Sequence, residues 1–163
     1  MATTVSAATL TVTLTESITL NGLDFGEENT LTVGSIVEVS SRIMNVDTSA
    51  SRTLLSFSSA IGTGQYIVGN VKYIRITNLD DTNYAEIIIA REAADDGMGG
   101  STYPGAILKL EAAKSIMLGL PDGTFGASAD GSSVAAGDLG DISSISAKAN
   151  TAAVDLQVFT AST

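Results

Sequence analysis

The sequence contains 163 residues, a length typical of one domain, and such a domain buries roughly 70% of its unfolded surface. Eight basic residues against eighteen acidic ones give a formal charge of −10. This balance argues against binding to nucleic acid or anionic lipid, because both need clustered lysine and arginine. The absence of cysteine and histidine excludes disulfides and every Ser-His or Cys-His catalytic arrangement. We therefore expect no enzyme and no cofactor.

No apolar run approaches the roughly 20 residues of a transmembrane helix. The residues from Met1 to Val5 lack the basic start and apolar run of a signal peptide. We therefore expect synthesis in the cytoplasm and no membrane partner.

The N-terminal third predicts a β-hairpin. Apolar and polar residues alternate strictly from Leu10 to Leu14, and the same parity continues through Ile18 and Leu20. Asn21-Gly22 follows, and this pair favours a type I′ hairpin turn. Residues 30–40 predict a strand with a bulge at Gly34-Ser35, and residues 42–46 and 53–57 predict further short strands.

The central segment predicts a second hairpin. Residues 66–68 and 71–76 have apolar residues on both faces, as does the strand predicted at 84–90. The turn cluster 78–83 would join 71–77 to 84–90. Arg75 lies between two isoleucines and so needs a partner, and Glu86 on the paired strand would provide it. An intersubunit contact of Arg75 is the alternative.

The C-terminal half predicts short strands between long loops. Residues 92–105 and 120–141 read as loops, and 142–146 and 154–159 as strands. Residues 107–110 and 115–118 are predicted as two strands flanking a short turn, in preference to one short helix. With ten to twelve strands in all, the chain predicts an all-β single domain (1–163), an antiparallel β-sandwich or jelly roll, with a polar N-terminal arm at residues 1–8.

The carboxylates favour turns over chemistry. Asp80 and Asp81, like Asp95 and Asp96, have the setting of Asx turns. Weak calcium candidates stand in the 120–141 loop, without the spacing of an EF-hand: Asp122, Asp130, Asp138 and Asp141. The glycine-rich run 97–102 lacks the lysine of a phosphate loop. We expect no metal site.

Candidate interface residues are few. They are Tyr73, Arg75, Met98, Tyr103 and Phe125. The chain has no tryptophan, so a sugar-stacking platform would have to use Tyr66, Tyr73 and Tyr84, for which packing within the domain is favoured.

The run from Val71 to Asp80, with Asn83 and the segment from Ile145 to Leu156, resembles small β-rich virion structural proteins of marine tailed phages. The resemblance implies a non-enzymatic virion subunit and carries no functional residues with it. We expect a capsid decoration subunit docked on the major capsid protein, and a homo-oligomer, with a trimer favoured. The alternatives are a tail, fibre or minor capsid subunit, or a carbohydrate-binding β-sandwich for host attachment. The N-terminal arm (1–8) is expected to lie against a neighbouring chain.

Overall fold

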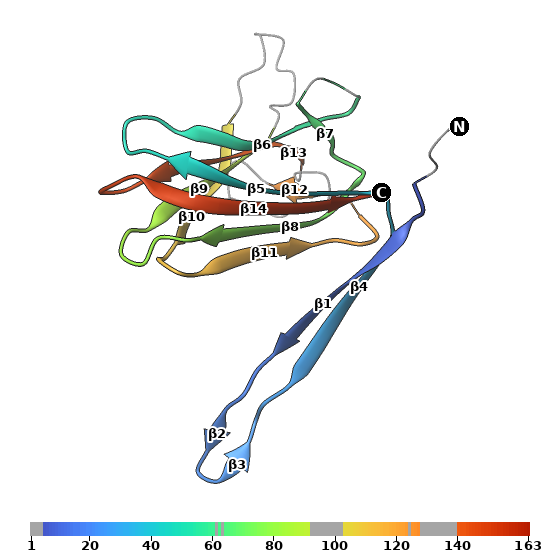
Figure 1. Cartoon of the computed structure of the whole chain (residues 1–163), viewed down its shortest axis with the longest axis vertical. Coiled ribbons are helices and arrows are strands. Elements are labelled where there is room, and N and C mark those ends of the chain that lie inside the picture. The colour runs from blue at the N-terminus through green and yellow to red at the C-terminus, as the bar shows by residue number, and fades with distance from the viewer. Residues whose placement is uncertain (1–4, 61, 63, 92–102, 124, 128–139) are drawn as a thin grey trace.

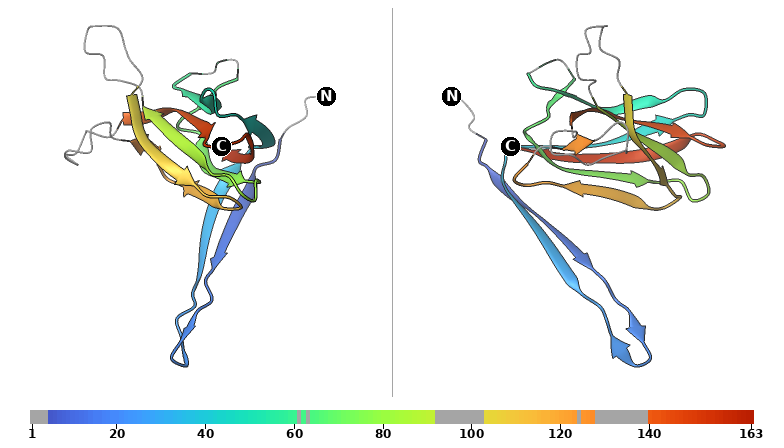
Figure 2. Two further views of the ribbon diagram at one scale, coloured as in Figure 1. Left: turned by 90° about the vertical axis from the view of Figure 1, so that its left-hand side faces the viewer. Right: turned by 180° about the vertical axis from the view of Figure 1, so that it is seen from behind.

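The computed structural model describes residues 5–60, 62, 64–91, 103–123, 125–127 and 140–163 (Figure 1). Every regular element in these ranges is a β-strand, so the predicted all-β class is confirmed. No helix in them is long and apolar enough to cross a membrane. The molecule consists of a two-layered body and a long β-ribbon that projects from one end of it (Figures 1 and 2).

Two sheets form the body. Sheet I has the strand order β10-β9-β13-β6-β7, with β12 beside β13. Its strands are β6 (Arg52–Ser58), β7 (Tyr66–Ile67), β9 (Ala85–Arg91), β10 (Tyr103–Leu110), β12 (Gly126–Ala127) and β13 (Gly140–Ala149). Sheet II has the order β11-β8-β14-β5. Its strands are β5 (Glu38–Val46), β8 (Val71–Asn78), β11 (Ser115–Gly119) and β14 (Val154–Ser162).

The core lies between the inner faces of the two sheets. Period-two alternation places Ile74 and Ile76 of β8 and Leu156 of β14 against Ile87 and Ile145 of sheet I. All five are at most 1% exposed. Each such side chain contributes about 1.5–3 kcal/mol through burial. This packing is the β-sandwich that the strand pattern predicts.

The projecting ribbon, here called the N-terminal hairpin, spans residues 8–36. It contains β1 (Ala8–Thr15), β2 (Thr19–Leu20), β3 (Leu23–Asp24) and β4 (Glu28–Ile36). Asn21 and Gly22 at its tip have φ angles of 53° and 80°. Positive φ at both positions is the type I′ geometry, so the predicted turn is confirmed. The predicted bulge is confirmed too, since Ser35 has φ 59° and the β1–β4 register shifts between Ala8 and Leu10.

The predicted hairpin of 71–77 with 84–90 is wrong. β8 pairs with β11 and β14, whereas β9 pairs with β10 and β13, so the two strands lie in different sheets. The turn between them crosses the sandwich. Buried Asn78 holds this corner, because its side-chain amide donates 2.8 Å to the Asn83 carbonyl and also reaches the carbonyls of Leu110 and Glu111. Two apolar faces mark a central strand and do not identify its partner.

The predicted pairing of Arg75 with Glu86 is wrong for the same reason. Arg75 lies opposite Phe159 on β14 and Met117 on β11. Glu86 lies in sheet I, opposite Lys148 and Lys109.

Several predicted boundaries also shift. β4 ends at Ile36 and β5 begins at Glu38, so the boundary between these strands lies at Val37 and not at position 41. Residues 103–105 belong to β10 and not to a loop, because their backbone pairs with β9. Residues 140 and 141 begin β13, where they pair with β12. Residues 107–110 and 115–118 are strands, as predicted, but they belong to opposite sheets.

Candidate interaction surface

The base of the N-terminal hairpin packs on the outer face of sheet II. Val33 and Ile36 of β4 form a small second core with Tyr73 of β8 and Ala161 of β14, and all four are buried. Leu10, Val12 and Leu31 of the hairpin border this cluster. A side chain at Gly119 of β11 would collide with Leu31. The absence of a side chain at Gly119 therefore lets the ribbon approach the sheet closely.

One pairing register runs along the hairpin from the Leu10–Val33 pair to the turn. Leu10 faces Val33, Thr15 faces Glu28 and Leu20 faces Leu23. Between the printed strands the ladder continues, because the Glu16 amide donates to the Glu27 carbonyl and the Phe25 amide donates to the Ile18 carbonyl. Residues directly opposite each other share a face of the ribbon. Even-numbered residues of β1 and β2 therefore lie on one face together with their partners.

This face is apolar at the base and again at the tip. In the proximal half of the hairpin (residues 8–13 and 30–36) it packs on the body. In the distal half (residues 14–29) it carries a group of four exposed side chains, here called the tip cluster. The tip cluster comprises Ile18 (54% exposed), Leu20 (58%), Leu23 (63%) and Phe25 (58%). The opposite face is polar and mostly threonine, for example Thr11 facing Thr32 and Thr13 facing Thr30.

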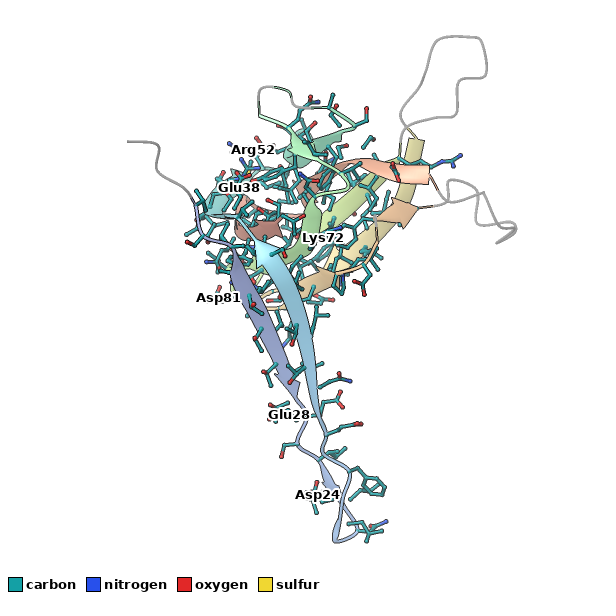
Figure 3. The ribbon with its side chains drawn as sticks, turned by 90° about the vertical axis from the view of Figure 1, so that its right-hand side faces the viewer. Asp24, Glu28, Glu38, Arg52, Lys72 and Asp81 are labelled. Carbon is teal, nitrogen blue, oxygen red and sulfur yellow. The ribbon has the colours of Figure 1, made fainter. Side chains whose placement is uncertain are left out.

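The hairpin carries only negative charges. Its ionisable residues are Glu16, Asp24, Glu27 and Glu28, and no lysine or arginine precedes Arg42 in the chain. Figure 3 shows Asp24 and Glu28 far out on the ribbon, whereas the labelled cations Arg52 and Lys72 lie on the body. Glu16 and Glu27 face each other next to the tip cluster. Directly opposed like charges destabilise a ribbon, so this pair favours a cation brought by a partner.

The outer face of sheet II carries such a cation. Arg75 lies in one row with Phe159 and Met117, and its guanidinium carbon stands 5.6 Å from the centre of the Phe159 ring. One terminal nitrogen donates 3.3 Å to Gln157, and the buried Nε makes no hydrogen bond. Among the described residues the single salt bridge joins Lys109 to Glu111, so no described carboxylate pairs with Arg75.

Apolar side chains surround this arginine. Met117 is 44% exposed, and Ile43 of β5, in the next row across from Gln157, is 62% exposed. We name Ile43, Arg75, Met117 and Phe159 the Arg75 patch. It is a half-buried cation within an exposed apolar surface, next to the place where the hairpin leaves the sheet.

A cavity of about 440 Å³ opens at the end of the body near the C-terminus. Charged and amide side chains line it, among them Glu38, Arg42, Gln65 and Asn70, with Tyr66 as the one aromatic ring. The Tyr66 hydroxyl accepts a 3.3 Å hydrogen bond from Thr160, so the ring is held in place.

The structure separates the predicted interface residues. Arg75 is in the patch described above. Tyr73 is only 4% exposed, covered by the chain's own hairpin, and Phe125 is 8% exposed in the main core. Met98 lies outside the described residues, as does the side chain of Tyr103.

The structure also describes some of the predicted turn carboxylates and calcium candidates. Asp80 Oδ1 accepts hydrogen bonds from the amides of Asn83 (2.5 Å) and Thr82 (2.8 Å), and these bonds lower the pKa of Asp80. Its Asx turn is thus confirmed. Asp122 and Asp141 are exposed. Asp95, Asp96, Asp130 and Asp138 lie outside the described residues, as do most of the loops 92–105 and 120–141 and residues 1–4 of the predicted arm. Among the described residues, no three acidic side chains form a group that could hold a metal ion.

The sequence reasoning missed the tip cluster and the projection of the hairpin. The signal was present in the sequence: the apolar parity that begins at Leu10 reaches Leu20 and resumes after the turn at Leu23 and Phe25. A comparison with protein-family models, curated proteins and solved structures finds no match to this chain.

Proposed function

We propose that this protein is a non-enzymatic structural subunit of a virion, a capsid decoration subunit docked on the major capsid protein, and that its N-terminal hairpin is the attachment element. The observation that carries this proposal is the tip cluster, four large apolar side chains at 54–63% exposure on a ribbon that leaves the body.

In a monomer, little stabilises a projecting ribbon of this kind. A two-stranded ribbon alone is marginally stable in water, and both its edges expose unpaired backbone groups. From Leu31, which contacts the body, to Asn21 at the turn, the ribbon reaches about 33 Å at 3.3 Å per residue. Docking on a neighbour would bury the tip cluster and cover these edges, which supports a role in an assembly. The resemblance to phage virion proteins supplies the kind of assembly.

The test compares the wild-type chain with a shortened hairpin on purified particles. Replacing residues 15–28 by Asn-Gly connects Leu14 to Asn29 through a two-residue turn. These two residues already face each other, so the register of the remaining strands is kept. The body should melt at an unchanged temperature, since the proximal half and its packing remain. Particle binding should fall to background. Retention of the shortened chain on particles would show that the hairpin is not the attachment element.

Copy number in the particle tests the position. Hundreds of copies distributed over the shell support a decoration subunit. A handful at one vertex would favour the tail, fibre or minor capsid alternative. Absence of the chain from particles would contradict the virion proposal itself.

A carbohydrate-binding sandwich for host attachment is the second candidate, and the cavity beside Tyr66 favours it. Amide and charged side chains around one aromatic ring are a donor set that suits a sugar. Binding on a glycan array that disappears in Tyr66→Ala would support this function. If the wild-type chain binds no glycan, the carbohydrate-binding function is contradicted and the structural function is retained.

A further inference from the structure

We infer that the partner of the distal hairpin is a second copy of this chain: the tip cluster and the Glu16–Glu27 pair of one copy dock on the Arg75 patch of the next. This inference rests on the proposed structural function, in which the hairpin attaches the subunit to the particle, and it names a neighbouring copy on the shell as the surface that receives the hairpin tip.

The two surfaces are complementary in charge. The hairpin presents two carboxylates directly across from each other with no cation on the ribbon. The patch presents a guanidinium with no described carboxylate partner and a buried Nε without a hydrogen bond. A guanidinium binds carboxylates through a planar set of donors, and such pairs are strongest where apolar side chains exclude water. Ile43, Met117 and Phe159 provide those apolar surroundings.

The apolar parts match as well. The tip cluster stands immediately beyond the Glu16–Glu27 pair along the same face, so a ribbon that places the pair over Arg75 lays the cluster along the same sheet surface. The chain's own proximal half occupies the neighbouring row, where it contacts Tyr73 and Ala161. Phe159 packs partly against this cluster, whereas Met117 (44% exposed) and Ile43 (62% exposed) leave a surface beside the first ribbon on which a second one can lie.

The contact cannot form within one chain in this structure. Figures 1 and 2 show the distal half pointing away from the body, past the β11 edge of sheet II. The hairpin and the patch are different surfaces, so the contact between copies is heterologous, and its repetition yields a ring or an open stack. A ring of three would agree with the trimer expected from the sequence.

The experiment is a charge exchange followed by sedimentation velocity over about 1–200 µM protein, where a half-buried ion pair changes affinity measurably. The wild-type chain should self-associate. Arg75→Glu alone and the double variant Glu16→Lys/Glu27→Lys alone should each weaken association about tenfold or more, because each brings like charges together. An equimolar mixture of the two variants should associate again, since every hairpin then finds a patch of opposite charge.

Two controls separate this contact from general charge effects and from misfolding. Glu28→Lys reverses one acidic charge, as each half of the double variant does, but Glu28 faces Thr15 on the threonine side of the ribbon, so this variant should leave association unchanged. Arg75→Gln keeps a neutral polar side chain at the patch and should weaken association without reversing the charge. Circular dichroism and thermal melting of each variant establish that the body is folded.

Three outcomes would overturn the inference: a monomeric wild-type chain across the whole range, a mixture that stays monomeric, or a Glu28→Lys effect as large as that of the double variant. A monomer that still decorates particles through its hairpin would refute self-docking and leave the proposed function intact. A self-associating chain absent from every particle would refute the virion function and leave the contact intact.

Discussion

The proximal and distal halves of the N-terminal hairpin share one register and one alternation, yet they differ completely in burial. Val33 in the proximal half is 1% exposed, whereas Leu23 in the distal half is 63% exposed. Both are aliphatic, and both lie on the apolar face of the same ribbon. The difference is what lies beside them: Tyr73 and Ala161 cover the first, and no described residue of this chain covers the second.

This contrast assigns different roles to the same local pattern. Apolar residues of the proximal half contribute to folding, because the chain itself buries Val33 and Ile36 fully and their apolar neighbours in part. Those of the distal half can contribute only when another surface arrives. Three substitutions and one change of pH, in order of expected effect, test this division.

Tyr73→Ala should have the largest effect. The ring is 4% exposed and meets Phe159 edge-on with 6.0 Å between centroids. Its removal leaves a cavity under the hairpin and should lower the free energy of unfolding by about 3 kcal/mol. Urea denaturation measures this loss. The control Leu23→Ala, at the exposed tip, should stay within about 0.5 kcal/mol of wild type. Equal losses in the two variants would show that the tip is also packed in solution.

Gly119→Val should have the second largest effect on stability. The added side chain would occupy the space of the Leu31 side chain, which must move and lose packing, at a cost of about 1 kcal/mol. Ser115→Thr on the same strand and face provides the control. It lies opposite Thr77 and keeps the hydroxyl group, which shares a 2.8 Å hydrogen bond with the Thr77 hydroxyl, so stability should be unchanged or slightly raised. Thermal melting of both variants, with proteolysis of the hairpin, compares the two sites.

Alkaline pH should lower the stability of the protein by a smaller amount, because it weakens the packing of the proximal half on Tyr73. Burial raises the pKa of Tyr73 above its ordinary value of 10.0, against an opposing influence of Arg75. The folded state therefore holds the proton more tightly than the unfolded state. Stability is full below pH 10 and declines as pH rises through the folded pKa of Tyr73. Melting temperatures should show this decline in wild type and in Tyr84→Phe, and a smaller decline in Tyr73→Phe. A decline of equal size in Tyr73→Phe would contradict its assignment to this group.

Gly26→Ala should have the smallest effect on global stability. A β-carbon there would stand 2.6 Å from the Glu16 carbonyl oxygen, so the two strands of the distal half must move apart. Because the distal half packs on none of the body residues that the structure describes, the free energy of unfolding should change by less than about 0.5 kcal/mol. Amide exchange at Phe25, which donates to Ile18, should accelerate. A drop of several kcal/mol would mean that the distal half stabilises the body.

Much of the local structure was predictable from residues alone. Asn21-Gly22 between alternating strands predicts the type I′ turn, and the Asp80 turn follows from its Asx chemistry. The partners of β8 and β9 were not predictable. Each is central in its sheet and apolar on both faces, so proximity in sequence suggested a hairpin that the corner at Asn78 does not make. Arg75 was recognised as an odd charge, but its neighbours Phe159 and Met117 are distant in sequence.

The sequence by itself determined the strands, the tight turn, the absence of thiol and imidazole chemistry and the acidic character of the first 41 residues, because these depend on side-chain type and on contacts within a few positions. Only the tertiary structure decided which strands share a sheet, that Tyr73 is covered and that the tip cluster is not. Those outcomes depend on which distant surfaces meet. The ribbon carries apolar side chains on one face at its base and at its tip, but only those at the base pack on sheet II.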